Sequence, residues 1–182
     1  MEEMMNNWWK KAVIYQIYPR SFKDSNDDGI GDINGIIEKL TYLEKLGVDG
    51  IWLSPIYQSP MVDNGYDISD YYKIDPLFGT MADFEALIEK AKQLNIRVIM
   101  YLVVNHTSDQ HLWFKESKKS KNNPRRDFYI WRDQPIGEFK NWTYDSSTQQ
   151  YYFHLFSPQQ PDLNWENEEV RKEIHKIGRA HV

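Results

Sequence analysis

The hydrophobic and polar positions follow two different periods along the first hundred residues. Residues 12–18 (AVIYQIY), 50–55 (GIWLSP) and 97–104 (RVIMYLVV) are short, apolar and rich in β-branched or aromatic side chains, which predicts strands. Between them, apolar residues recur every three or four positions, which predicts two amphipathic helices. The residues expected on the buried faces of these helices are Ile36, Leu40, Leu43 and Gly47, and then Phe84, Leu87, Ile88, Ala91 and Leu94.

The predicted order is strand, helix, strand, helix, strand. Thr80 followed by Asp83 is a capping pattern that predicts the start of the second helix. The second and third strands are nearly continuous apolar runs, which is typical of parallel strands covered on both faces. A right-handed series of this kind forms either a doubly wound sheet or a (β/α)₈ barrel. The sequence therefore predicts an α/β fold with a parallel sheet.

The pattern changes after the third strand. Residues 105–166 are loop-rich and aromatic, with β-like pieces such as 149–156 (QQYYFHLF), and a helix is predicted over 167–176. A (β/α)₈ barrel needs about 200 residues or more, whereas this chain has 182. If the fold is a barrel, we expect the chain to contain only its first three strands, with an inserted region after the third.

Composition narrows the classes of partner and the cellular location. The chain carries 22 basic and 27 acidic residues, a net charge of −5, and its basic cluster (115–126) is interrupted by Glu, Ser and Asn. We therefore expect no nucleic-acid and no membrane partner. Cysteine is absent, which excludes disulfides and thiolate metal sites. The first residues lack the order of a signal peptide, and no apolar run is long enough to span a membrane, so we expect a cytoplasmic protein.

One loop places oxygen-bearing side chains at alternate positions around two glycines. In the segment 24–32 (DSNDDGIGD), a hard cation such as Ca²⁺ could bind side-chain oxygens and a backbone carbonyl. An EF-hand is excluded because its twelfth position is Gly35 rather than Glu. A tight turn is the plain alternative, since Asp, Asn and Gly favour turns. The regular spacing favours a metal loop with the ligands Asp24, Asn26, Asp28, Asp32 and the Ile30 carbonyl.

Two further polar segments follow predicted strands. Residues 63–67 (DNGYD) come after the second strand, and Asn105-His106 end the third. Taken alone, the first is an Asn-Gly turn and the second contains a structural histidine. Since parallel barrels place their sites at the carboxyl ends of the strands, the two together favour a pocket for a polar ligand. Aromatic residues make up 15% of the chain, which is compatible with carbohydrate binding.

Several longer motifs occur along the chain, namely AVIYQIYPRSF, the metal-loop pattern, GVDGIWLSP, DNGYDISDY, FGTMADF, VVNHTSDQHLWF and HLFSPQQPDLNWEN. By these motifs and their order, the chain from about Trp8 to His175 resembles the amino-terminal part of the α-amylase family (glycoside hydrolase family 13). Residues 160–164 (QPDLN) resemble the signature of the oligo-1,6-glucosidase and dextran glucosidase branch. Trehalose-6-phosphate hydrolases tend to have Ala where this chain has Pro161.

The resemblance implies a (β/α)₈ barrel with an inserted domain B after strand three. It implies residues 1–104 as the first part of the barrel, 105–166 as domain B and 167–176 as the start of the next barrel helix. Ca²⁺ would be a structural ion in the loop 24–32. Asp63 would hydrogen-bond the non-reducing glucose of a short oligosaccharide, Tyr66 would stack on it, and His106 would bind its hydroxyls.

The reaction implied is hydrolysis of α-glucosidic bonds, α-1,6 by resemblance, with retention of configuration. The nucleophile and the acid/base of the family lie beyond residue 182, so no catalytic residue is assigned and we expect the chain alone to be inactive. The full-length protein is expected to be a monomer that acts in carbohydrate catabolism. Alternatives are a trehalose-6-phosphate hydrolase, a sucrose- or trehalose-isomerising relative, and, from another class, a non-catalytic sugar-binding or transporter-associated homologue.

The chain departs from the family pattern in three places. Tyr101 stands where the family has an Asp that orients the Arg beside the nucleophile, and we expect its bulk to overpack the barrel interior. Domain B is shortened between Arg132 and Trp142. Residues 177–182 (IGRAHV) correspond to one reading frame of a common sequencing adapter, and we expect them to be a non-native tail.

Overall fold

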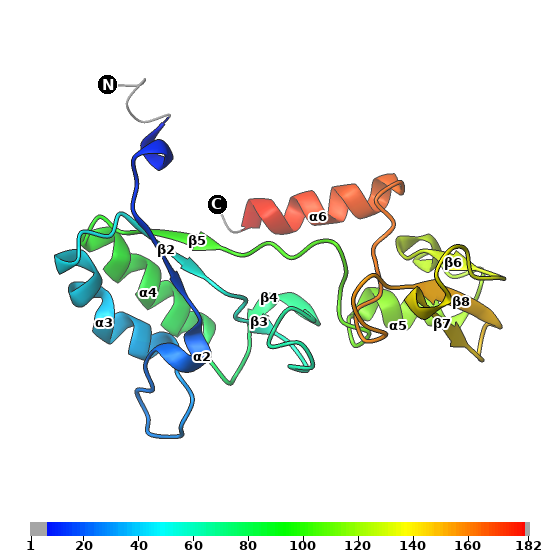
Figure 1. Cartoon of the computed structure of the whole chain (residues 1–182), viewed down its shortest axis with the longest axis horizontal. Helices are drawn as coiled ribbons and strands as arrows, with labels where there is room; N and C mark the ends of the chain where they lie inside the picture. Colours follow the sequence, from blue (N-terminus) through cyan, green and yellow to red (C-terminus); the bar gives the residue numbers. More distant parts are fainter. Residues whose placement is uncertain (1–6, 181–182) are drawn as a thin grey trace. The chain divides into compact units, whose positions relative to one another are not determined.

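The computed structural model describes residues 7–180, which form two units. Within this range, the first unit comprises residues 7–56 and 74–101, and the second comprises residues 57–73 and 102–180. Figure 1 shows the elements of both units along the chain. The second unit therefore takes in the connection 57–73, which follows the second predicted strand, as well as the region after the third.

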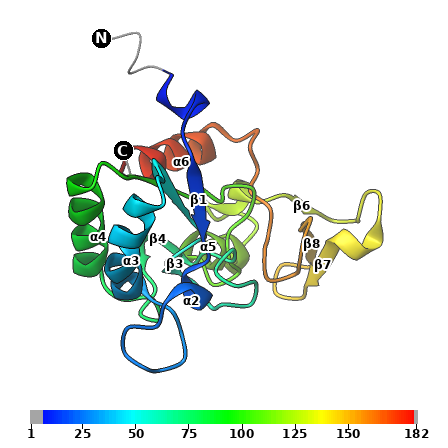
Figure 2. The same ribbon diagram turned by 60° about the vertical axis from the view of Figure 1, so that its left-hand side comes forward.

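The first unit contains a three-stranded parallel sheet in the order β1-β2-β5. Helices α3 and α4 pack against each other and lie on the same side of this sheet in both views (Figures 1 and 2). This arrangement confirms the predicted strand–helix–strand–helix–strand order and matches the first three strands of a (β/α)₈ barrel. The elements of the first unit are η1 (Trp8–Lys10), β1 (Ile14–Ile17), α2 (Pro19–Phe22), α3 (Ile33–Lys45), β2 (Gly50–Leu53), α4 (Met81–Gln93) and β5 (Arg97–Met100).

The ends and the buried faces of the two helices largely follow the sequence. Thr80 and Asp83 form the predicted capping box at the start of α4. The predicted residues Ile36, Leu40, Leu43, Leu87 and Ala91 are buried. Gly47 was expected on the same face but is exposed and has a φ of +82°, because it lies beyond the end of α3. Ile88 is 39% exposed, since it is one position away from the stripe that Leu87 and Ala91 form.

Strand β5 is shorter and less buried than the sequence predicts. It ends at Met100, which pairs with Leu53, whereas the prediction extended to Val104. The next partners on β2 would be Ser54 and Pro55, and a proline has no N–H to continue the ladder. The residues of β5 are half-buried or exposed, because both helices lie on one side of the sheet. Complete burial of this strand was therefore a wrong prediction for the described chain.

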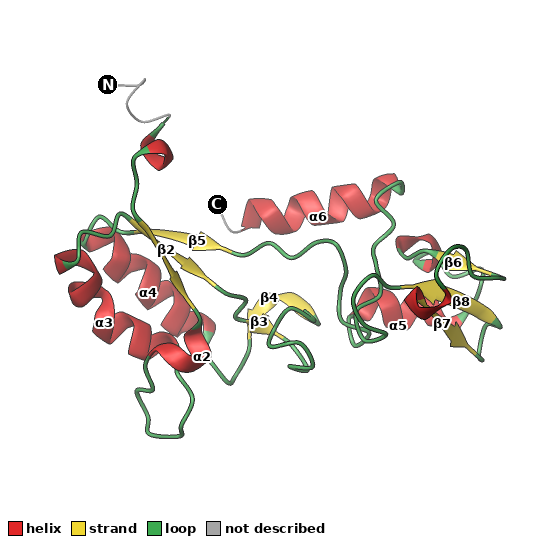
Figure 3. Ribbon diagram, viewed as in Figure 1, coloured by secondary structure: helices red, strands yellow, loops and turns green. Residues whose placement is uncertain are grey.

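The second unit contains two small sheets and two longer helices. One sheet joins β3 to β4, and the other is antiparallel in the order β6-β8-β7, as the colouring by secondary structure shows (Figure 3). Strand β8 confirms the β-like segment predicted near 149–156. The elements are β3 (Tyr57–Gln58), β4 (Asp70–Ile74), α5 (Leu112–Lys119), η2 (Arg126–Phe128), β6 (Trp131–Arg132), η3 (Phe139–Asn141), β7 (Trp142–Asp145), β8 (Gln150–Phe153) and α6 (Glu168–Ala180).

Aromatic rings form the core between α5 and the antiparallel sheet. The Phe114 ring lies 5.0 Å from the rings of both Tyr129 and Tyr152 and is stacked on Trp131 at 5.8 Å. The buried Arg126 guanidinium lies over Trp131, 3.4 Å from the ring centroid, and donates to the backbone oxygen of Ser117. A buried cation is thus stabilised by an aromatic face and by hydrogen bonds.

Helix α6 begins one residue after the predicted start and continues to Ala180. Val170, Ile174 and Ile177 are buried at helical spacing. The expected non-native tail (177–182) therefore begins inside this helix, while His181 and Val182 lie outside the described residues. In the range 7–180, no helix has the length and apolarity needed to cross a bilayer.

Candidate functional site

Three segments that are far apart in the sequence meet in the second unit. The Ser108 N–H donates to the Ile68 carbonyl at 2.8 Å, which joins the strand-three segment to the 57–73 connection. The Thr107 N–H donates to the Pro161 carbonyl, and the Leu163 N–H donates to the Asn105 carbonyl. These two bonds join the strand-three segment to the QPDLN segment. The candidate site residues Asp63, Tyr66 and His106 are therefore held in one unit by backbone hydrogen bonds.

The loop that carries Asp63 is anchored by a carboxylate that the sequence did not single out. Asp67 is fully buried and accepts hydrogen bonds from the Ser59 hydroxyl and from the Val62 and Asp63 N–H groups, each at 3.0 Å. The turn between them passes through Asn64 (φ +52°) and Gly65 (φ +95°), left-handed conformations that suit these two residue types. Asp67 therefore fixes the backbone from which the exposed Asp63 carboxylate projects.

Gln160 connects Asp63 to His106. Its side-chain amide donates to Asp63 Oδ2 at 2.8 Å, and the same nitrogen lies 3.1 Å from His106 Nε2. Gln160 is 1% exposed, so this amide is directed from the interior of the unit toward the exposed carboxylate. The two residues predicted to contact one sugar are thereby joined through one buried side chain.

Both ring nitrogens of His106 have polar neighbours. Nε2 lies 3.1 Å from the Tyr66 carbonyl oxygen, and Nδ1 lies 3.4 Å from the Asn105 side-chain nitrogen. The Tyr66 carbonyl only accepts, whereas the amide nitrogens of Asn105 and Gln160 only donate. Because the Gln160 nitrogen also lies 3.1 Å from Nε2, Nε2 faces both an acceptor and a donor, and neither tautomer satisfies every neighbour. Burial lowers the pKa of His106, although the Tyr66 carbonyl and nearby carboxylates act in the opposite direction. The imidazole is therefore neutral at pH 7.

Asp162 supports the other side of His106. Its carboxylate accepts from the Asn105 amide at 3.1 Å and from the Leu155 N–H at 2.9 Å, and its backbone forms a β-bridge with His106. Burial raises the pKa of Asp162 above its ordinary value. The Phe156 ring, which is 63% exposed, meets the His106 ring edge-on at 5.3 Å. An exposed aromatic face therefore adjoins the buried polar cluster.

The residues that sequence reasoning missed are buried polar groups in motifs already noted. Asp67 ends DNGYD, whereas Gln160 and Asp162 belong to QPDLN, which was used only as a branch signature. The residue types could have indicated a role, because a carboxylate or amide inside an apolar, aromatic segment needs hydrogen-bond partners when it is buried. The identity of those partners required the fold.

The proposed metal loop is held by hydrogen bonds between its side chains and its own backbone. The Asp24 carboxylate accepts from Asn26, Asp27 and Gly29 N–H groups, and these bonds, that of Gly29 foremost, lower its pKa. The two oxygens of Asp32 cap α3 and bind Ser25. Throughout residues 7–180, no three His, Asp or Glu side chains are grouped as a metal site. The oxygen donors of the loop suit Ca²⁺ chemically, and its binding stays a prediction.

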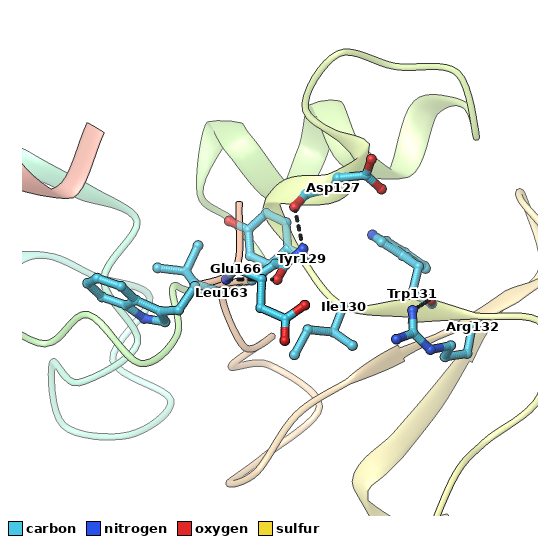
Figure 4. A pocket seen from close by; sticks show the side chains of 9 residues that line it. Asp127, Tyr129, Ile130, Trp131, Arg132, Leu163 and Glu166 are labelled. Atoms are coloured by element: carbon cyan, nitrogen blue, oxygen red, sulfur yellow. Dashed lines mark hydrogen bonds between the residues drawn. The ribbon is translucent and has the colours of Figure 1, made fainter. Parts of the chain in front are cut away.

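A separate pocket of about 410 Å³ lies elsewhere in the second unit. Figure 4 shows its lining, which combines aromatic and aliphatic side chains with two carboxylates and one guanidinium. No residue of the predicted site lines it. The lining residues are Asp127, Tyr129, Ile130, Trp131, Arg132, Leu163, Asn164, Trp165 and Glu166.

The parallel βα series, the region inserted after its third strand and the polar site that joins three motifs match the amino-terminal part of the α-amylase fold. The model of the α-amylase catalytic domain matches residues 16–182, and the chain belongs to this family.

Relatives with several different enzyme names match the chain. The chain is 59% identical over 184 residues to an oligo-1,6-glucosidase from Heyndrickxia coagulans. The aligned region covers 95% of this chain and 33% of the relative. A crystal structure of an isomaltulose synthase from Protaminobacter rubrum matches 94% of the chain with a TM-score of 0.91 and 54% identity. A trehalose-6-phosphate hydrolase from Bacillus licheniformis matches 93% with a TM-score of 0.90 and 56% identity. In each case the chain spans about one third of the relative's length.

Proposed function

We propose that this chain provides the glucose-binding part of a retaining α-glucosidase that hydrolyses α-1,6 bonds in short oligosaccharides. The observation that carries the proposal is the contact of one buried amide, Gln160, with both Asp63 and His106. The high identity to an oligo-1,6-glucosidase supports the linkage, as does Pro161 in the QPDLN segment. The activity belongs to a protein longer than this chain and is inferred from the relatives.

The donors and acceptors of the site suit a glucosyl unit. An exposed carboxylate such as Asp63 can accept hydrogen bonds from two neighbouring hydroxyls, and a tyrosine ring such as Tyr66 can cover the apolar face of the sugar. The side-chain nitrogens of Gln160 and His106 lie 3.1 Å apart, and the Gln160 amide donates to the Asp63 carboxylate. A sugar hydroxyl can both donate to a carboxylate and accept from an N–H, which supports a hydroxyl as the group recognised there.

The binding part of this proposal is tested by titrating the 182-residue chain with isomaltose in a calorimeter. We expect saturable binding that is weakened in Asp63→Asn, since the amide can no longer accept bonds from both hydroxyls and Gln160. The matched control is Asp109→Asn, a half-exposed aspartate in the neighbouring motif. Equal affinities in the chain and in Asp63→Asn would contradict the proposal.

The chain itself is expected to release no glucose. By resemblance, the nucleophile and the acid/base follow later barrel strands, and we assign neither role to a residue within 1–182. Incubation with isomaltose, sucrose and trehalose 6-phosphate, followed by an assay for glucose, tests this expectation. Turnover of any of the three would show that the chain contains its own catalytic carboxylates.

We further propose that the loop 24–32 binds a structural Ca²⁺. Asp24, Asn26, Asp28 and the Ile30 carbonyl would hold the ion, and Asp32 would have to share an oxygen that now caps α3. The bound ion would fix the loop that precedes α3 and would take no part in the chemistry. We also retain, as parts of the proposal, a cytoplasmic location and a monomeric full-length protein.

A further inference from the structure

The antiparallel sheet of the second unit is aromatic on both faces. One face packs into the unit through Trp131 and Tyr152, which pair directly across β6 and β8 and are both buried. A sheet with one solvated face ordinarily carries polar side chains there. Here Tyr144 and Tyr151 pair directly across β7 and β8, with ring centroids 5.0 Å apart, and Tyr144 is 51% exposed.

This outer aromatic face continues along both strands and toward β6. The next pair on the same face is Trp142 and Phe153, with rings 5.2 Å apart. On the other side, Arg132 of the edge strand β6 pairs directly with Tyr151, so its side chain projects from the same face. A row Arg132–Tyr151–Tyr144 therefore crosses the sheet.

The row leads to the pocket described above, because Arg132 also lines that pocket. In the described chain, the carboxylates of Asp127 and Glu166, also in the lining, make no ion pair or side-chain hydrogen bond, and both residues are exposed. Trp165 is held by a hydrogen bond from its ring nitrogen to the Val104 carbonyl and is 39% exposed. The surface thus offers aromatic faces, free acceptors and a donor (Figure 4).

We propose that this surface, defined as the pocket together with Arg132, Tyr151 and Tyr144, is an accessory binding site for a neutral α-glucan segment. Aromatic faces contact the apolar sides of sugar rings, while carboxylates and a guanidinium bond their hydroxyls. Two carboxylates against one guanidinium give a negative surface, which selects against phosphorylated sugars. The choice of a glucan rests on the proposed function, whereas the surface contains none of Asp63, Tyr66 and His106.

The test measures binding of isomaltotriose to the 182-residue chain by calorimetry, with and without the Asp63 site. In Asp63→Asn, the affinity of the accessory site should be retained. When Tyr144→Ala and Tyr151→Ala are added to Asp63→Asn, the remaining affinity for isomaltotriose should fall about tenfold. A tenfold fall corresponds to the loss of one to two aromatic contacts. Tyr72→Ala is the matched control, because Tyr72 is a strand tyrosine of the same unit with a similar exposure of 53%, and it should leave the affinity unchanged.

A second variant and a second ligand keep the result interpretable. Glu166→Gln alters one exposed side chain with no bond to lose in the described structure, and it should also weaken binding while the melting temperature is unchanged. Trehalose 6-phosphate should bind this surface more weakly than isomaltotriose. The proposal is overturned if Asp63→Asn abolishes all binding, if the tyrosine variants match Tyr72→Ala, or if no binding occurs. Loss of binding in the tyrosine variants but none in Asp63→Asn would support this site and contradict the proposed primary one.

Discussion

The first unit is held by apolar packing under a regular parallel sheet, whereas the second encloses many polar side chains. In the first unit the buried polar residues are Asp32, Ser54 and Asp75, next to helix and strand ends. In the second, buried polar groups such as Asp67, Gln160 and Asp162 connect segments of loop to one another. We therefore expect the first unit to tolerate the loss of a single polar group better than the second, in which buried polar groups connect the loops.

The largest effect that tests this difference is expected from Asp67→Ala. Three donors would lose their acceptor inside the second unit, and leaving them unsatisfied should cost about 3 kcal/mol of unfolding free energy. Denaturant unfolding measures the loss, and isomaltose binding should disappear with it because Asp63 is no longer fixed. Asp127→Ala serves as control, because Asp127 is an exposed aspartate of the same unit whose carboxylate makes no ion pair or side-chain hydrogen bond in the described chain, and it should leave the midpoint unchanged. If Asp67→Ala leaves the unfolding free energy unchanged, the proposed difference between the two units is contradicted.

Acid should destabilise the second unit through His111. Burial lowers the pKa of His111 to about 4 from an ordinary 6.5, with Arg125 acting in the same direction and Asp70 against it. The unfolded chain then binds more protons between pH 6.5 and 4, so stability falls as the pH falls through this window, by about 2 kcal/mol between pH 7 and 5.

The variant His111→Asn separates this effect from other titrations. His111 Nδ1 accepts from the Trp113 N–H at the start of α5, and an asparagine keeps a capping acceptor that does not titrate. Unfolding free energies at pH 7 and 5 should therefore differ less in the variant. The same difference in both proteins would show that His111 does not carry the pH dependence.

A smaller effect is expected in the first unit from Ca²⁺. One millimolar Ca²⁺ should raise the melting temperature by about 3 °C if the loop 24–32 binds it, since a ligand of the folded state stabilises by mass action. Asp24→Asn should remove the increase, and Asp109→Asn in the second unit should preserve it. If the melting temperature is the same with Ca²⁺ and with a chelator, the loop 24–32 is not a metal-binding loop.

The smallest effect concerns Tyr101. Its ring stacks on Trp52 with centroids 5.3 Å apart and planes at 19°, and the residue is half-buried. The ring is therefore accommodated beside β2 in the described chain, and overpacking of a complete barrel interior stays a prediction. Tyr101→Asp should lose about 1 kcal/mol of unfolding free energy with the stack, and Tyr101→Phe should retain it. A stabilised Tyr101→Asp in denaturant unfolding would indicate strain at this position.

The sequence predicted the first unit better than the second for a physical reason. Apolar residues recur at regular spacing in helices and strands buried on one side, so α3, α4 and the capping box of α4 were predictable from local pattern. The capping role of Asp32 at α3 was not predicted. Strand β5 ends at Met100, opposite Leu53 at the end of its partner β2, and no pattern within β5 contains that information.

The candidate site shows the same limit more sharply. Asp63, Tyr66 and His106 were predictable as members of motifs, yet Gln160 reaches Asp63 across 97 positions of sequence. Such a contact leaves no local periodicity. The buried acceptor Asp67 lies four residues from Asp63, but its role depends on three donors that only the folded loop brings together.

The most direct test of the account follows the site residues themselves during ligand binding. The chain, labelled with ¹⁵N at histidine and glutamine, is titrated with isomaltose and observed by NMR. We predict saturable shifts of the His106 imidazole and the Gln160 side-chain amide, absent in Asp63→Asn. Saturable binding that leaves both signals unmoved, or equal shifts in Asp63→Asn, would contradict the assignment of the glucose site to these three segments.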